Sequence, residues 1–368
     1  TGIEPETLLD TSTTGLPTYE KLTAITDSSI GGEYHRAYYY DYKGREIQRV
    51  ECDFEGNILR TTSRYDLIGN LLAQRESYTH GGTTDVLDRT FEYDSRSRMT
   101  KETAQFNDGE QAVVAYTYDD LGQLTGKTYG TGAHAIHETM DYNMQGWLTE
   151  KSSELFEMRL DYFETYRDWL MPSYTGNISE WKWGNRSYRF EYDNLGRISD
   201  AHYYEGNTLR DDYSEKNISY DLNGNIRSLT RYDAGVPETL DYTYTNGILK
   251  AVGNKSIAYD GCGNITFNGR NNLEIDYNFL NLPMRIHSTD GQSVVNYRYL
   301  ADGSKFSATD DTGEGLIYIG SLVYRFRNGA YELDHAVFSQ GFFRKNHLIE
   351  NHEYVPVYYV CDHLGSPR

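Results

Sequence analysis

The motif that decides the fold is Phe190-Glu191-Tyr192-Asp193-Asn194-Leu195-Gly196-Arg197-Ile198: an aromatic residue, then Tyr-Asp, two residues, a glycine, a polar residue and an aliphatic residue. We call this unit the cassette. Six copies keep tyrosine, aspartate and glycine at one spacing, namely Tyr40-Asp41 with Gly44, Tyr65-Asp66 with Gly69, Tyr118-Asp119 with Gly122, Tyr192-Asp193 with Gly196, Tyr220-Asp221 with Gly224, and Tyr259-Asp260 with Gly263. Degraded copies fill the intervals, and the early copies recur about every 25 residues. This recurrence predicts a repeat architecture.

Each cassette is predicted to form one β-hairpin. Residues two apart on a strand share a face, so Phe190 and Tyr192 point the same way. Asp193 can accept hydrogen bonds from the backbone of its own turn, and Gly196 can take the positive φ that closes the turn. Ile198 then begins the return strand opposite the aromatic residues. We expect the tyrosines of successive hairpins to stack along the sheet.

The composition favours an ordered chain over a disordered one and excludes several partners. The 368 residues carry a formal charge of −20 and include 35 tyrosines and 34 glycines. Disordered chains are poor in aromatic residues, whereas tyrosine favours strands. The acidic balance disfavours nucleic acids and anionic membranes as main partners, and no run approaches the roughly 18 apolar residues of a membrane span.

The repeats are expected to occupy most of the chain. Residues 1–30 form a lead-in, and residues 31–368 form the repeat region. Residues 151–185 interrupt the rhythm, with Leu155–Tyr162 readable as a strand or a helical turn. Because cassettes resume at Tyr192, we interpret the interruption as a local irregularity and not as a domain boundary. The final segment, 354–368, is more apolar at its start.

Neither catalysis nor a metal site is predicted. The cassette aspartates suit turn caps better than calcium loops, which cluster several carboxylates. His347 and His352 lack the spacing of zinc proteases, so a solvated loop is favoured over a metal cluster. Cys52, Cys262 and Cys361 are too scattered for a disulfide framework. No cofactor is expected.

The rings of Trp181 and Trp183 are candidates for contact with a glycan by stacking. Packing on the face of the sheet is the default alternative for both side chains. The sequence leaves these two interpretations open.

The cassettes, together with a terminal Asp362-His363-Leu364-Gly365-Ser366, resemble the RHS/YD-repeat proteins, a family that includes Tc toxin C-subunits and teneurins. Three longer stretches resemble the form common in Bacteroidetes: Tyr174–Ser179 with Trp181-Lys182-Trp183, Gly263–Pro283, and Tyr297–Lys305. The resemblance extends from about residue 16 to the last residue. It implies an all-β fold of repetitive antiparallel hairpins, in one long spiralling sheet that forms part of a hollow shell.

The resemblance also implies a function. Many family shells enclose a C-terminal toxin domain, which a self-cleaving aspartate site releases. We expect this chain to be such a wall, secreted or on the cell surface, with its own C-terminal toxin as cargo in interbacterial competition. Secretion-apparatus and immunity proteins would bind regions outside this chain, which begins at Thr1 without a methionine and stops at the terminal motif.

Two other functions stay open as alternatives. One is an adhesion or carbohydrate-binding surface. The other is a self-cleaving protease, which we do not expect because the sequence contains no Asp-Pro dipeptide. The favoured interpretation is therefore that the protein is not an enzyme. His363 is expected to mark a turn of the wall.

Overall fold

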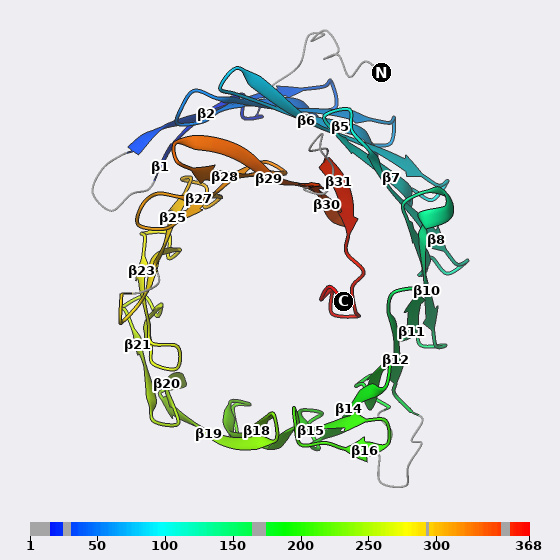
Figure 1. Ribbon diagram of the computed structural model, residues 1–368, viewed down its shortest axis with the longest axis vertical. Helices are drawn as coiled ribbons and strands as arrows, with labels where there is room; N and C mark the ends of the chain where they lie inside the picture. Colours follow the sequence, from blue (N-terminus) through cyan, green and yellow to red (C-terminus); the bar gives the residue numbers. More distant parts are fainter. Residues whose placement is uncertain (1–14, 25–30, 164–173, 292–293, 347–353) are drawn as a thin grey trace. The chain divides into compact units, whose positions relative to one another are not determined.

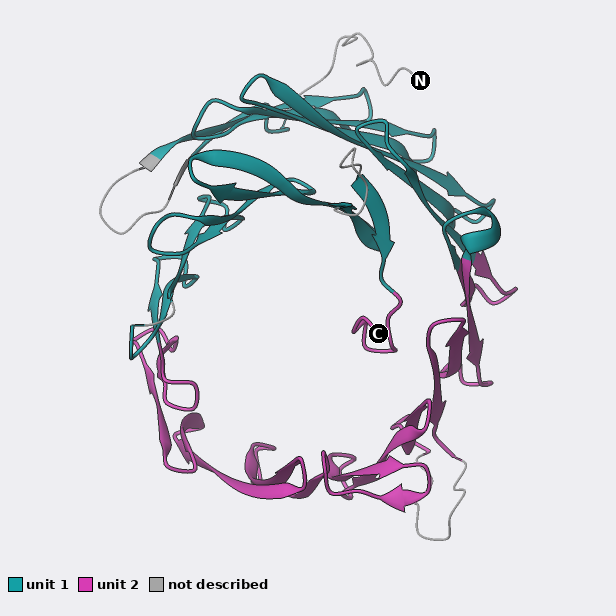
Figure 2. Cartoon of the chain, viewed as in Figure 1, with its two compact units in different colours: residues 1–116, 128–135, 274–359 teal, residues 117–127, 136–273, 360–368 magenta. Residues whose placement is uncertain are grey.

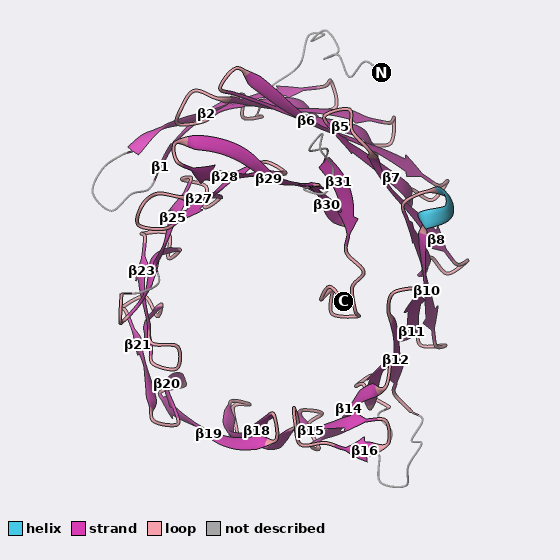
Figure 3. Ribbon diagram, in the orientation of Figure 1, coloured by secondary structure: helices cyan, strands magenta, loops and turns pink. Residues whose placement is uncertain are grey.

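The computed structural model describes residues 15–24, 31–163, 174–291, 294–346 and 354–368. Within these residues the fold is all-β, as the repeats predict: 31 strands join one antiparallel sheet, accompanied by one short 3₁₀ helix, η1 (Gly132–His134). Figure 3 shows this near-complete dominance of strands. Part of the predicted lead-in, residues 1–14 and 25–30, lies outside the described residues, and Tyr19–Ala24 is already a strand.

The chain divides into two compact units, coloured separately in Figure 2. Unit 1 comprises residues 1–116, 128–135 and 274–359, and unit 2 comprises residues 117–127, 136–273 and 360–368. The boundaries pass through β8 (Gln111–Tyr118), β9 (Leu124–Tyr129) and β23 (Leu273–Tyr277).

The strands of unit 1 come from both ends of the chain. Its first set is β1 (Tyr19–Ala24), β2 (Gly31–Tyr40), β3 (Glu46–Cys52), β4 (Ile58–Tyr65), β5 (Leu71–His80), β6 (Thr83–Tyr93), β7 (Met99–Phe106) and most of β8. Its second set is β24 (Pro283–Ser288), β25 (Val294–Tyr299), β26 (Lys305–Thr309), β27 (Gly315–Ile319), β28 (Leu322–Arg327), β29 (Ala330–Phe338), β30 (Gly341–Lys345) and β31 (Tyr354–Tyr358).

The two sets pack as layers around a core to which aromatic rings from both sets contribute. Figure 1 shows β28 to β30 running alongside the early strands. The ring centroids of Tyr78 and Tyr324 lie 5.3 Å apart, and those of Phe106 and Phe343 lie 6.4 Å apart. All four side chains are almost fully buried. Rings from distant parts of the chain therefore pack together in the core of unit 1.

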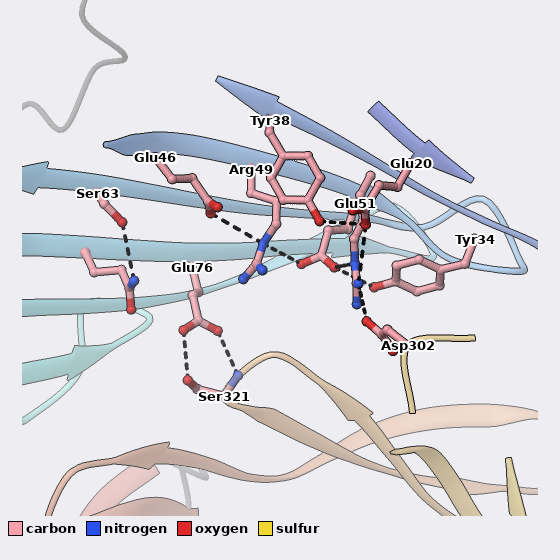
Figure 4. A network of polar contacts seen from close by, with 12 residues as sticks. Glu20, Tyr34, Tyr38, Glu46, Arg49, Glu51, Ser63, Glu76, Asp302 and Ser321 are labelled. Carbon is pink, nitrogen blue, oxygen red and sulfur yellow. Dashed lines mark hydrogen bonds and ion pairs between the residues drawn. The ribbon is translucent and has the colours of Figure 1, made fainter. Parts of the chain in front are cut away.

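Buried carboxylates also join the layers of unit 1. Glu76 on β5 accepts hydrogen bonds from the backbone N and the Oγ of Ser321, both at 2.8 Å, and Figure 4 shows the two residues facing each other. Farther along, Arg36 donates to Glu51 at 2.6 Å and also contacts Asp302. A buried carboxylate is costly unless it is paired in this way.

Unit 2 is a meander of short hairpins with a thinner core. Its strands are β10 (Ile136–Tyr142), β11 (Leu148–Ser153), β12 (Glu157–Asp161), β13 (Glu180–Trp183), β14 (Arg186–Tyr192), β15 (Ile198–Glu205), β16 (Thr208–Leu209), β17 (Glu215–Tyr220), β18 (Ile226–Asp233), β19 (Val236–Thr245), β20 (Ile248–Val252), β21 (Lys255–Tyr259) and β22 (Ile265–Asn268). Two small clusters of buried residues lie in this unit, one of Met158, Leu160 and Tyr162 and one of Leu229, Leu240, Val252 and Ile257.

The cassette turn has the geometry that the sequence predicts. Asp193 Oδ1 accepts from the backbone N of Leu195 and of Arg197 at 2.9 and 3.0 Å, while Oδ2 accepts from Arg197 Nε at 2.7 Å. Gly196 has a φ of 75°. Backbone and side-chain hydrogen bonds from Arg197 are the main reason that the pKa of Asp193 lies below its usual value. Ser97 stands in the glycine position of a degraded copy. It adopts the same left-handed backbone conformation, with φ of 60°, at some conformational cost.

Successive cassettes are connected by hydrogen bonds of the tyrosine hydroxyls and not by the expected stacking of tyrosine rings. The hydroxyl of Tyr192 donates to the carbonyl of Ile178 at 2.7 Å, and the hydroxyl of Tyr220 donates to the carbonyl of Ile198 at 2.7 Å. Tyr244 makes the corresponding bond to Ile226 at 3.1 Å. The guanidinium of Arg197, in place of a tyrosine ring, lies over Tyr220 at 4.2 Å. In these three hairpins the tyrosine hydroxyl thus bonds to the backbone carbonyl of an isoleucine that begins or precedes an earlier strand.

The described part of the predicted irregularity at 151–185 includes strand residues of β11, β12 and β13. Residues 157–161 form strand β12 and no helical turn. Gly176, with φ 90°, precedes Ile178, whose carbonyl accepts the Tyr192 bond, so this stretch retains the second half of a cassette. Residues 164–173 lie outside the described part of the chain.

The hydroxyl bond can be tested by replacing Tyr192 with phenylalanine. Tyr192→Phe removes only the donor to Ile178 and should lower the free energy of unfolding by about 0.5–1.5 kcal/mol, measured by urea denaturation, with hydrogen exchange near β13 and β14 faster than in the wild type. Tyr42→Phe is the control, because Tyr42 is an exposed turn residue. Similar effects of both substitutions would contradict the bond's role.

The need for a left-handed glycine in the cassette turn can be tested with a closely matched control substitution. Gly224 and Gly261 both face open space, but only Gly224 has a left-handed φ, of +86°. Gly224→Ala should therefore cost about 1–2 kcal/mol, while Gly261→Ala should be neutral or slightly stabilising. Urea denaturation combined with local hydrogen exchange measures both. Equal losses would show that the turn does not need the positive φ.

Candidate functional site

Strand β13 in unit 2 presents the two tryptophans singled out from the sequence. Trp181 and Trp183 are two residues apart and share one face, with ring centroids 4.5 Å apart. Tyr188 of β14 lies 5.8 Å from Trp183 and 5.4 Å from Tyr203 of β15. We call Trp181, Trp183, Tyr188 and Tyr203 the aromatic face. Its rings are partly or fully buried against one another.

The opposite side of the same strands carries paired charges. Arg189 Nε donates to Glu180 at 2.8 Å, and Lys182 Nζ lies 3.0 Å from Glu180 and 2.9 Å from Asp161. Burial by itself raises the pKa of Glu180, but the hydrogen bonds from Arg189 and Lys182 outweigh burial and keep its pKa below the usual value. The alternation of β13 thus separates an aromatic side from an ionic side.

The terminal motif folds as a cassette turn. Asp362 Oδ1 accepts from the backbone N of Leu364 and of Ser366 at 2.9 and 3.0 Å. Gly365 has φ +85°. Arg368 donates to Asp362 Oδ2 at 2.5 Å, as Arg197 does to Asp193. Both carboxylate oxygens of Asp362 are therefore engaged in holding the turn.

The structure brings this terminal turn onto the aromatic face. The His363 ring lies edge-on to Trp181 with centroids 4.9 Å apart, and the guanidinium of Arg368 lies 5.3 Å from the Trp181 ring centroid. Lys151 Nζ on β11 donates to the carbonyl of Cys361 at 2.6 Å. The sequence marked His363 and Trp181 separately; nothing in their spacing indicates that they meet. Arg368 and Lys151 were not predicted as part of any site.

The electrostatics of the turn favour a neutral His363. Burial lowers the pKa of His363, and Arg368 and Lys151 lower it further, against the opposing effect of Asp362. The Nδ1 atom of His363 is buried without a hydrogen-bond partner in the described structure. Burial raises the pKa of Asp362, but Arg368 and the turn's own N–H groups outweigh it, so its pKa is lowered. Protonated His363 would add a cation beside two others.

A second group of charges lies behind the turn. Lys151 pairs with Glu138 on β10 at 3.0 Å, and both are buried. Burial lowers the pKa of Lys127 on β9, a shift that Glu138 partly opposes. Lys151, Glu138 and Lys127 are thus charged groups on the strands that neighbour the docked turn, whereas Asp362 lies in the turn itself.

The contacts described at this site are ring packing and polar contacts among the chain's own residues. No group of three or more histidine, cysteine, aspartate or glutamate residues suited to a metal ion occurs in the described residues. The three cysteines are free thiols, while His347 and His352 lie outside the described residues. Because Arg368 and His363 contact Trp181, a glycan would have to displace the chain's own terminal turn there. No helix in the described segments is long and apolar enough to cross a membrane.

The comparisons with known proteins found relatives of low sequence identity. No family model matches the chain. Human teneurin-4 is 22% identical over 350 residues, covering 89% of this chain and 12% of teneurin-4. Danio rerio teneurin-3 is 22% identical over 351 residues, with the same two coverages, 89% and 12%. The chain therefore spans about an eighth of the length of the curated relatives it matches. This similarity supports the resemblance seen in the cassettes.

Two solved toxin structures also align with the chain. The Photorhabdus luminescens Tc holotoxin pore aligns over 92% of this chain and 23% of its own, at 13% identity and a TM-score of 0.43. The TcdB2–TccC3 structure without its hypervariable C-terminal region aligns over 92% and 23%, at 14% identity and a TM-score of 0.38.

The docked turn should respond to acid. Since the pKa of His363 is lowered on docking, docking is strongest above the ordinary histidine pKa of about 6.5 and weakens as the pH falls below it. Hydrogen exchange of residues 360–368, corrected for intrinsic rates, should show protection falling between pH 7.5 and 5. His363→Phe keeps a ring on Trp181 but cannot titrate, so its protection should stay level. An identical fall in this variant would exclude His363 as the sensing group.

Proposed function

We propose that residues 31–368 form a segment of the wall of a YD-repeat shell that encloses a polypeptide cargo. The cargo is the C-terminal toxin domain of a secreted or surface protein used in interbacterial competition. The wall acts by steric exclusion, and we assign no catalytic residue and no cofactor to this chain. Immunity or secretion-apparatus proteins would act through other regions of the full protein.

The observation that carries this proposal is that the polar groups of the cassette are engaged in hydrogen bonds within the fold. In the copy at Asp193, both carboxylate oxygens bind the turn, Gly196 supplies the positive φ, and the hydroxyl of Tyr192 binds the preceding repeat. A recurring motif whose polar atoms all serve the turn or the neighbouring hairpin makes a continuous sheet, and no chemical group is left over at each repeat. This is what a wall requires.

The resemblance and the comparisons add support from a different direction. The similarity to teneurins extends over 89% of the chain, so it concerns the repeat array as a whole and not one local motif. The net charge of −20 disfavours nucleic acid as the enclosed material. A polypeptide is the cargo consistent with both facts.

The alternative function is a carbohydrate-binding adhesion surface. The aromatic face favours it, because rings from three neighbouring strands lie side by side. Trp183 is the better candidate contact, since the terminal turn already contacts Trp181. Glycan binding that is lost in Trp183→Ala would favour this alternative over the shell, and no binding on a broad glycan array would remove it.

Small-angle scattering of the 368-residue chain tests the shell. A solid globule of this length has a radius of gyration of about 21 Å, and an unfolded chain about 70 Å. A wall around a cavity places mass away from the centre, so we expect a value clearly above 21 Å with full β-sheet circular dichroism. A value close to 21 Å would overturn the proposal.

Protease protection tests the enclosure of cargo. In the full-length protein, polypeptide that follows the repeats should resist trypsin while the sheet is folded and should be digested once urea unfolds the sheet. Rapid digestion in the native state would show that the repeats do not enclose it.

A further inference from the structure

A polar groove lies on the second layer of unit 1, over strands β28 to β31, which pair in sequence order. Its volume is about 640 Å³, which falls within the range of about 300–1,000 Å³ that small-molecule sites occupy. The charged residues that line it are Arg325, Arg344, Lys345, Glu332 and Asp334. None of them belongs to a cassette turn.

The groove opens on the side of the second layer that faces away from the first layer. Phe343 on β30 is fully buried, and its ring packs on Phe106 of the first layer. Neighbouring residues of a strand point to opposite faces, so Phe342 and Arg344 point away from the first layer. Both residues line the groove, and packing between the layers does not cover them.

A β-bulge brings two polar side chains of β29 to the groove. In the pairing of β28 with β29, two neighbouring residues of β28 are opposite Leu333 and His335, which leaves Asp334 as the extra residue. Such a bulge re-aims the side chains beside it. Asp334 Oδ2 lies 2.8 Å from His335 Nδ1, so the imidazole is held with its Nε2 turned away from Asp334. Burial raises the pKa of Asp334, but hydrogen bonds from His335 and Arg325 outweigh burial and keep its pKa below the usual value.

The two carboxylates of the groove are already paired with two of its cations. Arg325 donates to Asp334 at 2.6 Å, and Lys345 donates to Glu332 at 2.8 Å. Arg344, in contrast, makes no ion pair with any residue that the structure describes. One uncompensated positive charge therefore remains in the groove.

Arg344, His335 and Phe342 lie next to one another. Arg344 is directly opposite His335 in the pairing of β29 with β30, and the Cβ atoms of such opposite residues are about 5 Å apart. The rings of His335 and Phe342 meet edge to face, with centroids 5.6 Å apart. A guanidinium with no carboxylate partner thus stands beside a half-buried aromatic ring.

We propose that this groove binds a small monocarboxylate that carries an aromatic body. The planar guanidinium of Arg344 suits bidentate contact with a carboxylate, and its single free charge matches a single negative charge. Phe342 offers a ring on which the body of the ligand can pack. A phosphate monoester, with a charge near −2, would bring more negative charge than Arg344 alone compensates. This binding does not depend on whether the chain encloses a cargo.

A ligand-observed NMR titration of the full chain with N-acetyl-L-phenylalanine tests the proposal. A molecule of this size in an open groove should bind with a Kd of about 1 mM, and added NaCl should weaken the binding by screening. N-acetyl-L-phenylalaninamide has the same aromatic body without the charge. It should bind at least about tenfold more weakly, because it cannot form the charge-assisted hydrogen bonds.

Substitutions in the groove separate the charge from the ring. Arg344→Gln should weaken binding of N-acetyl-L-phenylalanine at least about tenfold, and Phe342→Leu should weaken it severalfold. Since Arg344 is exposed, the circular dichroism and urea midpoint of Arg344→Gln should match those of the wild type. Arg327→Gln is the matched control, because Arg327 is an exposed arginine of β28 that does not line the groove. It should bind as the wild type does.

Four results would overturn the proposal: no binding of N-acetyl-L-phenylalanine to the wild type, equal binding of the amide, binding that survives Arg344→Gln, or equal weakening by Arg327→Gln. Inorganic phosphate serves as a competitor in the same titration. If phosphate bound more tightly than N-acetyl-L-phenylalanine, the groove would be a phosphate site and the assignment to a monocarboxylate would be wrong.

Discussion

The bond on which this structure depends joins the cassette aspartate to its own turn. One oxygen accepts from two backbone N–H groups, and in the copies with arginine or asparagine after the glycine the other accepts from that side chain. This arrangement fixes the length of the turn and therefore the register of both strands. The register shift between Glu191 and Tyr192 puts Tyr192 opposite Ile198. Hairpins closed by this turn thus share the same strand register, which allows them to repeat.

Next to the turn, the hydrogen bond of the tyrosine hydroxyl connects one hairpin to the preceding part of the sheet. Burial raises the pKa of Tyr192 to about 12, so its hydroxyl remains a proton donor to Ile178 throughout the ordinary pH range. Within the meander of unit 2 each repeat contacts mainly its neighbours, as in other repeat proteins. Local damage in unit 2 should therefore loosen a few hairpins and leave the neighbouring hairpins folded.

The two units contain the same cassette hairpins but pack them differently. Unit 1 adds a second layer, whose attachment relies on buried carboxylates such as Glu76 and on rings such as Tyr324. Unit 2 keeps its aromatic face and covers part of it with its own terminal turn. That turn is built like the Asp193 turn but packs against the ring of Trp181 on a face of the sheet.

The sequence by itself determined the all-β class, the hairpins, the aspartate-capped turns and the positions of their glycines, because each follows from contacts within about six residues. It predicted tyrosines stacking on tyrosines, and there the tertiary structure decided otherwise. The partner of the Tyr192, Tyr220 and Tyr244 hydroxyls is a backbone carbonyl, which any residue can supply, so no side-chain pattern marks it. The same holds for Glu76 with Ser321, 245 residues apart, and for Trp181 with His363. Only the path of the folded sheet brings such residues together.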